Sequence, residues 1–149
     1  MYTHLEDYIA ELYGNMSISH PDQLNISSLS KRLRVNIYYS SASFRIGNNI
    51  VIRRSNKRRE WQEFGHEVCH YLVHPGNQLK MHFLFRDLQE YQANYFAYHF
   101  CVPTFMLEDV NDLSVYKIMN LFNVEYEFAL RRLEMYERKI LDAMQANRN

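Results

Sequence analysis

Residues 62–74 read QEFGHEVCHYLVH, and this stretch decides how the rest of the chain is interpreted. His66 and His70 are four positions apart, and Glu67 follows His66 directly. On a helix, positions i and i+4 lie on the same face, so both imidazoles can reach one metal ion. Glu67 then flanks the ion without ligating it, as a general base for water would. The pattern predicts a zinc site; the alternative is two ordinary surface or core histidines.

The residues around the motif favour a helix. Apolar side chains recur at helical spacing from Trp61 to Leu72, and the run stops at His74-Pro75-Gly76. Ser55 or Asn56 can cap its start. Cys69 points away from the two histidines and is expected, like Cys101, to be a buried packing residue.

The rest of the chain predicts an α+β fold with helices, a small sheet and further helices. We expect helices over 3–13, from Ile26 to Leu33 (capped by Asn25 or Ser27), and over 87–101, 115–122 and 125–143. Residues 35–39 predict a strand, and 43–53 a hairpin around Gly47-Asn48-Asn49. Residues 81–85 predict a short strand or a buried turn. The strand at 50–52 could be a sheet edge to which an extended substrate adds.

Length and composition indicate one domain over 1–149, with a core of about 24–105 and a C-terminal helical part of about 106–145. The 17 basic and 17 acidic residues cancel, so direct DNA binding is not expected. The N-terminal residues lack the apolar core of a signal peptide, and no run reaches the length of a membrane span. The two cysteines form no disulfide framework. We therefore expect a cytoplasmic protein without membrane contact; its oligomeric state is left open.

A catalytic zinc site needs a third protein ligand. Val73 and Gly76 stand where the metzincin pattern requires glycine and histidine, so that class is excluded. Glu90, on a separate downstream helix, is the leading candidate. Asn94, one turn later, could hydrogen-bond a ligand or be an ordinary surface amide. The competitors for the third position are Asp87, His74, His82 and His99.

Two motifs together resemble the ImmA/IrrE metallopeptidases. HEVCHYLVH supplies His66, Glu67, His70 and His74, and EYQANYFAYHFCVP supplies Glu90, Gln92, Ala93, Asn94, Phe96, Ala97 and Val102-Pro103. LNISSLSKRLRVNIYY also resembles the segment that precedes the family's hairpin, so the likeness covers roughly residues 24–105. Cys69 departs from the family pattern, where glycine is usual.

The resemblance implies a small zincin-like, minimal gluzincin domain that acts as a zinc endopeptidase. His66, His70 and Glu90 would hold one Zn²⁺ per chain, and Glu67 would activate water. His74 is a candidate contact to the substrate or to the oxyanion. Relatives of the ImmA type are encoded by bacterial prophages and integrative elements, and act as anti-repressors that cleave the element's own helix-turn-helix repressor. That repressor is the expected partner.

Two rival functions remain open on the sequence. The chain could bind and sequester a repressor with a purely structural zinc, with the helices at 114–143 as its docking surface. It could also be a metallohydrolase for a non-protein substrate. The basic run RRSNKRR at 53–59 is either a solvated helix start or a docking site for an acidic substrate surface.

Overall fold

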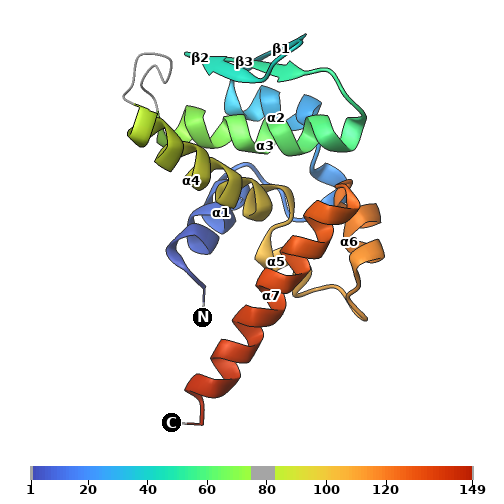
Figure 1. Cartoon of the computed structure of the whole chain (residues 1–149). Coiled ribbons are helices and arrows are strands. Elements are labelled where there is room, and N and C mark those ends of the chain that lie inside the picture. Colours follow the sequence, from blue (N-terminus) through green and yellow to red (C-terminus); the bar gives the residue numbers. More distant parts are fainter. Residues whose placement is uncertain (1, 75–82, 149) are drawn as a thin grey trace.

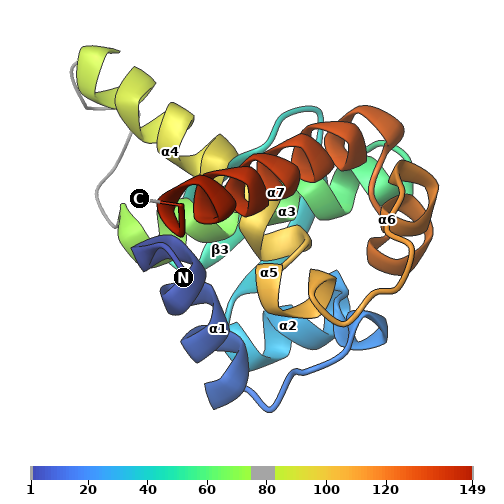
Figure 2. The same cartoon turned by 90° about the horizontal axis from the view of Figure 1, so that it is seen from below.

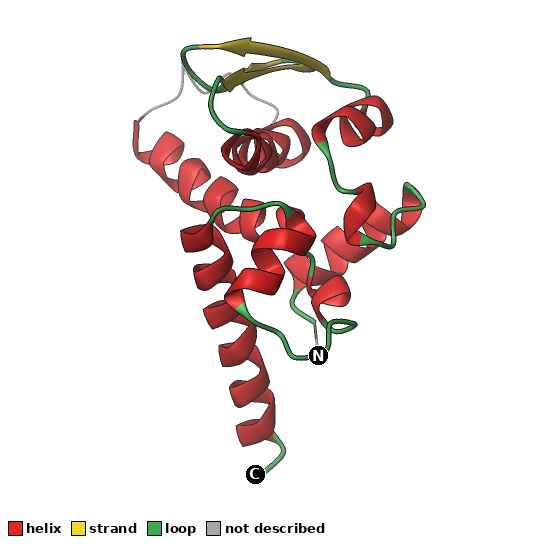
Figure 3. Ribbon diagram, turned by 90° about the vertical axis from the view of Figure 1, so that its right-hand side faces the viewer, coloured by secondary structure: helices red, strands yellow, loops and turns green. Residues whose placement is uncertain are grey.

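The computed structural model describes residues 2–74 and 83–148 and has the α+β organisation that the sequence predicts. A small sheet covers one side of the long helix α3, with α2 beside α3, and the other helices lie on the opposite side of α3 (Figures 1 and 3). In chain order the elements are α1 (His4–Asn15), the 3-10 turn η1 (Pro21–Gln23), α2 (Ile26–Leu33), β1 (Asn36–Ser40), β2 (Phe44–Ile46), β3 (Asn49–Arg53), α3 (Lys57–Val73), α4 (Phe83–Cys101), α5 (Thr104–Leu107), α6 (Val115–Phe122) and α7 (Tyr126–Ala146).

Short polar side chains start several of these helices by accepting hydrogen bonds from free backbone N–H groups. Asn25 caps α2 and Asn56 caps α3, which settles the two pairs of capping candidates. Thr3 and Glu6 form a reciprocal capping box at α1. These local signals explain why the helix starts could be read from the sequence.

The sheet has the strand order β1-β3-β2. β2 and β3 form the expected antiparallel hairpin, with Gly47 at a φ of 60° in its turn. The expectation that the strand at 50–52 is a sheet edge is wrong, because β1 pairs in parallel with its other side. Ile50 and Ile52 are fully buried in this central strand. The edges of the sheet are β1 and β2.

The helix α3 packs between the sheet and α4. Its buried residues include Phe64 and Val68, and Phe64 meets Phe100 of α4 edge to face. Gly65 faces α4, and an added Cβ there would stand 2.8 Å from Cys101 Sγ. A small residue at this position lets α3 and α4 approach closely.

The helix α4 begins at Phe83, so residues 83–85 are helical and the predicted strand or turn is wrong there. Residues 81 and 82 lie outside the described part of the chain. Period-two and period-3.6 patterns are hard to separate in an apolar run as short as MHFLF.

Seen from below, α7 runs across the helical layer, with α6 beside its N-terminal part (Figure 2). A buried polar group joins this helix to α1. Arg132 donates to the Val102 carbonyl at 2.9 Å and to Thr104 Oγ1 at 2.8 Å, and Thr104 in turn donates to Glu6. The first and last helices are therefore held by one hydrogen-bonded network.

Both cysteines, Cys69 on α3 and Cys101 on α4, are buried free thiols, as expected. Among the described residues, no helix combines the length and apolar character needed to cross a membrane.

Candidate metal centre

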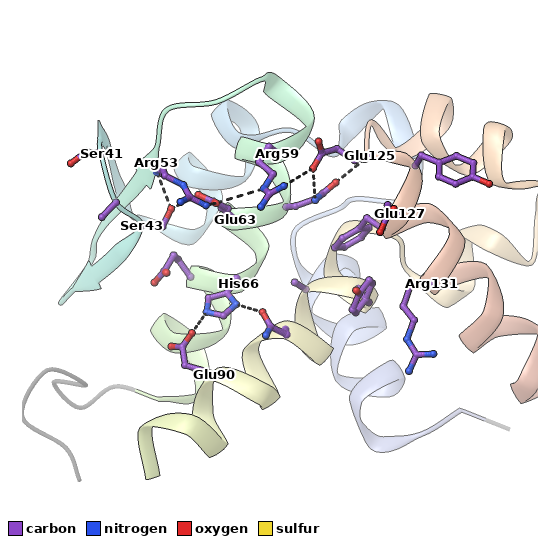
Figure 4. Close-up of a pocket in the computed structure, with 18 residues that line it drawn as sticks. Ser41, Ser43, Arg53, Arg59, Glu63, His66, Glu90, Glu125, Glu127 and Arg131 are labelled. Carbon is purple, nitrogen blue, oxygen red and sulfur yellow. Dashed lines mark hydrogen bonds and ion pairs between the residues drawn. The ribbon is translucent and has the colours of Figure 1, made fainter. Parts of the chain in front are cut away.

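The packing of α4 on α3 brings Glu90 to the two histidines of the H-E-x-x-H motif. Glu90 Oε2 lies 2.8 Å from His66 Nε2, and Glu90 Oε1 lies 2.8 Å from His70 Nε2. The two Nε2 atoms are 3.2 Å apart. Figure 4 shows the His66 ring and the Glu90 carboxylate facing each other across the two helices. The leading candidate for the third ligand is thus beside the first two.

The donor set fits a zinc ion. Within the described ranges, these three residues form the group of His, Cys, Asp or Glu side chains able to hold a metal, with donor atoms within 4.8 Å of one another. Zinc binds imidazole nitrogen and carboxylate oxygen at about 2.0–2.2 Å, so the edges of its tetrahedron are about 3.3 Å. The donor atoms need to separate by only a few tenths of an ångström to reach that spacing.

The charges at the site are mutually stabilising. Hydrogen bonds from His66 and His70 hold the pKa of Glu90 well below its ordinary value. Burial disfavours a charged His66 ring, but the hydrogen bond and negative charge of Glu90 outweigh burial and raise the pKa of His66. The carboxylate therefore stays ionised, as a metal ligand must.

Asn94 supports His66 from the side opposite to Glu90. Its Oδ1 lies 2.7 Å from His66 Nδ1, which leaves His66 Nε2 directed toward Glu90. A hydrogen bond at Nδ1 fixes the orientation and tautomer of a histidine that ligates through Nε2. The structure thus favours the supporting role over the alternative of an ordinary surface amide.

Glu67 is buried beside the trio, with 5% of its surface exposed, and it lines the cleft described below. Burial raises the pKa of Glu67 to about 7; the charge of His66 opposes this rise and that of Glu90 adds to it. A carboxyl group with such a pKa can both accept and release a proton near neutrality.

His74 does not have the surroundings expected of a substrate contact. It is 6% exposed, and its Nδ1 lies 3.1 Å from His70 Nδ1, on the side of that ring away from Glu90. Its Nε2 lies 2.8 Å from Gln92 Oε1. Burial lowers the pKa of His74, which favours the neutral ring. Both ring nitrogens are thus engaged within the protein.

Two of the other candidates for the third ligand, His99 and Asp87, are not part of the trio. His99 is buried at the far end of α4, where Nδ1 lies 3.1 Å from the Tyr95 carbonyl oxygen. Asp87 is exposed and is absent from the trio. His82 lies outside the described residues.

A cleft of about 1080 Å³ opens beside His66 and Glu90 of the trio. Its floor includes His66, Glu67 and Glu90, and its far wall comes from the start of α7. Tyr98 and Phe128 stack there with ring centroids 4.4 Å apart. The contribution of α7 was not predicted, because no local pattern in its sequence shows where a distant helix docks.

Charged pairs form one wall of this cleft. Arg53 and Arg59 both pair with Glu63, at 3.0 and 3.9 Å, and Arg59 also reaches Glu125 at 3.5 Å (Figure 4). Two members of the basic run at 53–59 therefore line the cleft, which neither of the two earlier interpretations of that run specified. The Arg59–Glu63 pair has the i,i+4 spacing of neighbours on one helix. The Arg53–Glu63 and Arg59–Glu125 pairs join separate elements and could not be predicted from local spacing.

Comparison with known proteins places the motifs in a family context. The family model Peptidase_M78, described as an IrrE N-terminal-like domain, matches residues 24–134. This range contains the three donor residues, Glu67 and all the residues that line the cleft.

Two relatives come from Bacillus subtilis (strain 168). The phage-like element PBSX protein XkdA is 39% identical over 148 residues, which cover 92% of this chain and 75% of XkdA. The uncharacterized protein YqaB is 32% identical over 149 residues, which cover 93% of this chain and 87% of YqaB. No solved structure matches the chain.

Proposed function

The chain belongs to the Peptidase_M78 family, with its IrrE N-terminal-like domain, and on that premise we propose that it is a zinc-dependent endopeptidase. The observation that carries the proposal is the convergence of His66, His70 and Glu90 beside the buried Glu67. His66, Glu67 and Glu90 also line an open cleft. A glutamate from a second helix as third ligand corresponds to the gluzincin arrangement, and we accordingly assign a minimal zincin-like fold.

The roles of the residues follow from their positions. His66 Nε2, His70 Nε2 and Glu90 would hold one zinc ion per chain. Bound zinc would polarise the scissile carbonyl and acidify a water molecule. Glu67 would accept a proton from the attacking water and donate it to the leaving amine, and its buried position beside His66 suits this role. Asn94 keeps His66 oriented.

The cleft is suited to an extended peptide. Ser43, directly before the edge strand β2, lines it, and among the residues that the structure describes β2 pairs with β3 alone. An extended substrate can add to such an edge through main-chain hydrogen bonds. We therefore move the expected site of strand addition from β3 to β2.

As substrate we propose a helix-turn-helix repressor of a phage or mobile element, so that the protein acts as an anti-repressor. The relative XkdA supports this, since its name assigns it to a phage-like element. A repressor substrate would place the reaction in the cytoplasm of the bacterial host. With 17 basic and 17 acidic residues, the chain is expected to meet the repressor rather than its DNA.

The decisive test is Glu67→Gln, assayed with the repressor encoded in the same element. We expect the variant to retain about one zinc per chain while cleavage falls by at least about 100-fold, the usual contribution of a general base. Glu137→Gln, on the exposed side of α7, makes the same chemical change away from the cleft and should leave cleavage unchanged.

The same variant tests sequestration with a structural zinc. If Glu67→Gln still released the repressed genes in cells while cleaving nothing, the endopeptidase mechanism would be wrong. Undiminished cleavage by the variant would remove Glu67 from the mechanism.

A further inference from the structure

Behind the metal centre, two side chains continue from His70 in a line of hydrogen bonds. His70 Nδ1 lies 3.1 Å from His74 Nδ1, and His74 Nε2 lies 2.8 Å from Gln92 Oε1. We propose that His74 and Gln92 are positioning residues, which fix the tautomer and orientation of His70 and thereby set the metal affinity. The inference rests on the metal site proposed above.

The direction of each hydrogen bond follows from the chemistry of the rings. His70 Nε2 faces Glu90, so His70 can ligate a metal only through an unprotonated Nε2. Its proton then sits on Nδ1 and needs an acceptor, which is His74 Nδ1. The neutral His74 ring must carry its own proton on Nε2, where it donates to Gln92 Oε1. One amide oxygen thus determines the tautomers of two histidines.

The backbone of His74 is held by two hydrogen bonds, in addition to the two contacts of its ring. Its backbone N–H donates to the His70 carbonyl at 3.0 Å, and its own carbonyl accepts from Arg45 Nη2 at 2.9 Å. Arg45 comes from β2, so the sheet holds His74, the C-cap residue directly after α3. The rings of His70 and His74 lie 5.3 Å apart between centroids. A ring held in this way can serve as a fixed acceptor.

The two metal-binding histidines are supported in parallel. Asn94 Oδ1 lies 2.7 Å from His66 Nδ1, and Gln92 reaches His70 through His74. Both amides come from α4, within four residues of Glu90. This short segment therefore supplies the third ligand together with an orienting group for each of the first two.

The alternative is that the His74–Gln92 contact only stabilises the packing of α3 on α4. The two roles differ in what each predicts for the metal-free protein. A packing role predicts a lower melting temperature of the metal-free variants. A positioning role predicts that the variants bind zinc more weakly. Their stability without metal should be nearly unchanged, because Gln92 is exposed and contributes little to packing.

The experiment measures zinc affinity by competition with a chelator, alongside the melting temperature in EDTA. We expect Gln92→Leu to weaken zinc binding by about 10- to 100-fold, the usual effect of losing a group that orients a ligand. Gln92→Glu keeps an acceptor for His74 Nε2 and should bind zinc within a few-fold of the wild type. Gln145→Leu, exposed near the end of α7, is the matched control and should not change the affinity.

A double-mutant cycle tests whether Gln92 acts on His70 through His74, an arrangement that we call the relay. His74→Phe should weaken zinc binding as much as Gln92→Leu, and the double variant should lose no more than His74→Phe alone, since Gln92 acts through His74. Ring-nitrogen chemical shifts of the zinc-loaded wild type should show His70 protonated at Nδ1.

The failures are distinguishable. A wild type that binds no zinc overturns the proposed function and this inference together. A wild type that binds zinc, with Gln92→Leu binding equally well, overturns the relay alone. Equal weakening by Gln92→Leu and Gln92→Glu, or additive losses in the double variant, also overturns it.

Discussion

Glu90 is the residue on which the metal site depends most directly, because it comes from a different helix than the two histidines. Its two oxygens reach both Nε2 atoms at 2.8 Å. Removing the carboxylate leaves two imidazoles from one turn of helix, which make an incomplete zinc site.

We therefore expect protein purified without added metal to contain about one zinc per chain, and Glu90→Ala to contain little. Elemental analysis of the two proteins checks this. Asp87→Ala, one turn earlier on α4 and exposed, is the control and should keep its zinc. Equal zinc in wild type and Glu90→Ala would show that another residue completes the site.

His99 is a second residue with a testable electrostatic consequence. Burial and the nearby positive charge of Arg132 lower the pKa of His99 to about 4, against the opposing effect of Glu6. In the unfolded chain a histidine titrates near 6.5. Between about pH 6.5 and 4 the unfolded state therefore binds a proton that the folded state does not, so His99 lowers stability as the pH falls.

His99→Gln should accordingly flatten the loss of stability on acidification. Over the range from pH 6.5 to 4.5 we expect the wild type to lose about 2 kcal/mol more than the variant. Urea unfolding of the metal-free proteins at both pH values measures this difference in the free energy of unfolding. The contributions of titrating groups that both proteins share cancel in the comparison. Parallel stability curves for the two proteins would contradict the assignment.

At the scale of elements, the contact of α3 with α4 controls the geometry of the site. An added Cβ on Gly65 would lie 2.8 Å from Cys101 Sγ and 3.3 Å from Phe100 Cδ1. Such overpacking costs about 1–3 kcal/mol, while alanine gains about 1 kcal/mol of helix propensity over glycine.

We expect Gly65→Ala to be destabilising by about 1 kcal/mol in net terms, because the overpacking exceeds the gain in propensity. Cys101→Ala removes the nearest atom, so the double variant should be more stable than the sum of the single effects predicts. Chemical denaturation of the wild type, the two single variants and the double variant gives the four free energies of unfolding that the comparison needs. Strict additivity would mean that Gly65 and Cys101 do not interact.

The helices and strands differ in how well the sequence alone predicts them. Helix starts at Asn25 and Asn56 could be predicted, because a cap is a contact between neighbours in the chain. The central position of β3 could not be predicted, because its parallel partner β1 precedes the hairpin in the chain and nothing in NIVIR indicates that pairing. The donor trio could be predicted because two short motifs carry it. The charged wall of the cleft could not, because Glu125 meets Arg59 only through tertiary packing.

At the scale of the whole molecule, the buried group around Arg132 connects the two ends of the chain. Arg132 is 1% exposed, and Lys139 of the same helix pairs with Glu6 of α1 at 3.1 Å. Hydrogen bonding by Thr104 and Lys139 outweighs the effect of burial and lowers the pKa of Glu6 to about 2. The C-terminal helix is therefore part of the folded unit rather than an appendage.

Arg132→Leu should destabilise the protein by about 3 kcal/mol or more, since it leaves the Val102 carbonyl and Thr104 without their buried donor. Arg138→Leu, exposed on the same helix, should change stability by less than about 0.5 kcal/mol. Thermal unfolding compares the two. Similar small effects would show that the network contributes little to holding α7.

The alkylation rate of the two buried thiols reports how often the helices that carry them separate. Cys69 and Cys101 lie on the two helices that carry the metal-binding side chains, and burial raises the pKa of both thiols. A thiol reagent attacks the thiolate, so alkylation must wait for these helices to separate. Zinc that bridges α3 and α4 opposes this separation, and at free zinc of about 100 times its dissociation constant alkylation should slow by about 100-fold. The rate of a simple labelling reaction thus reports how tightly the metal joins the two helices, without any knowledge of the substrate.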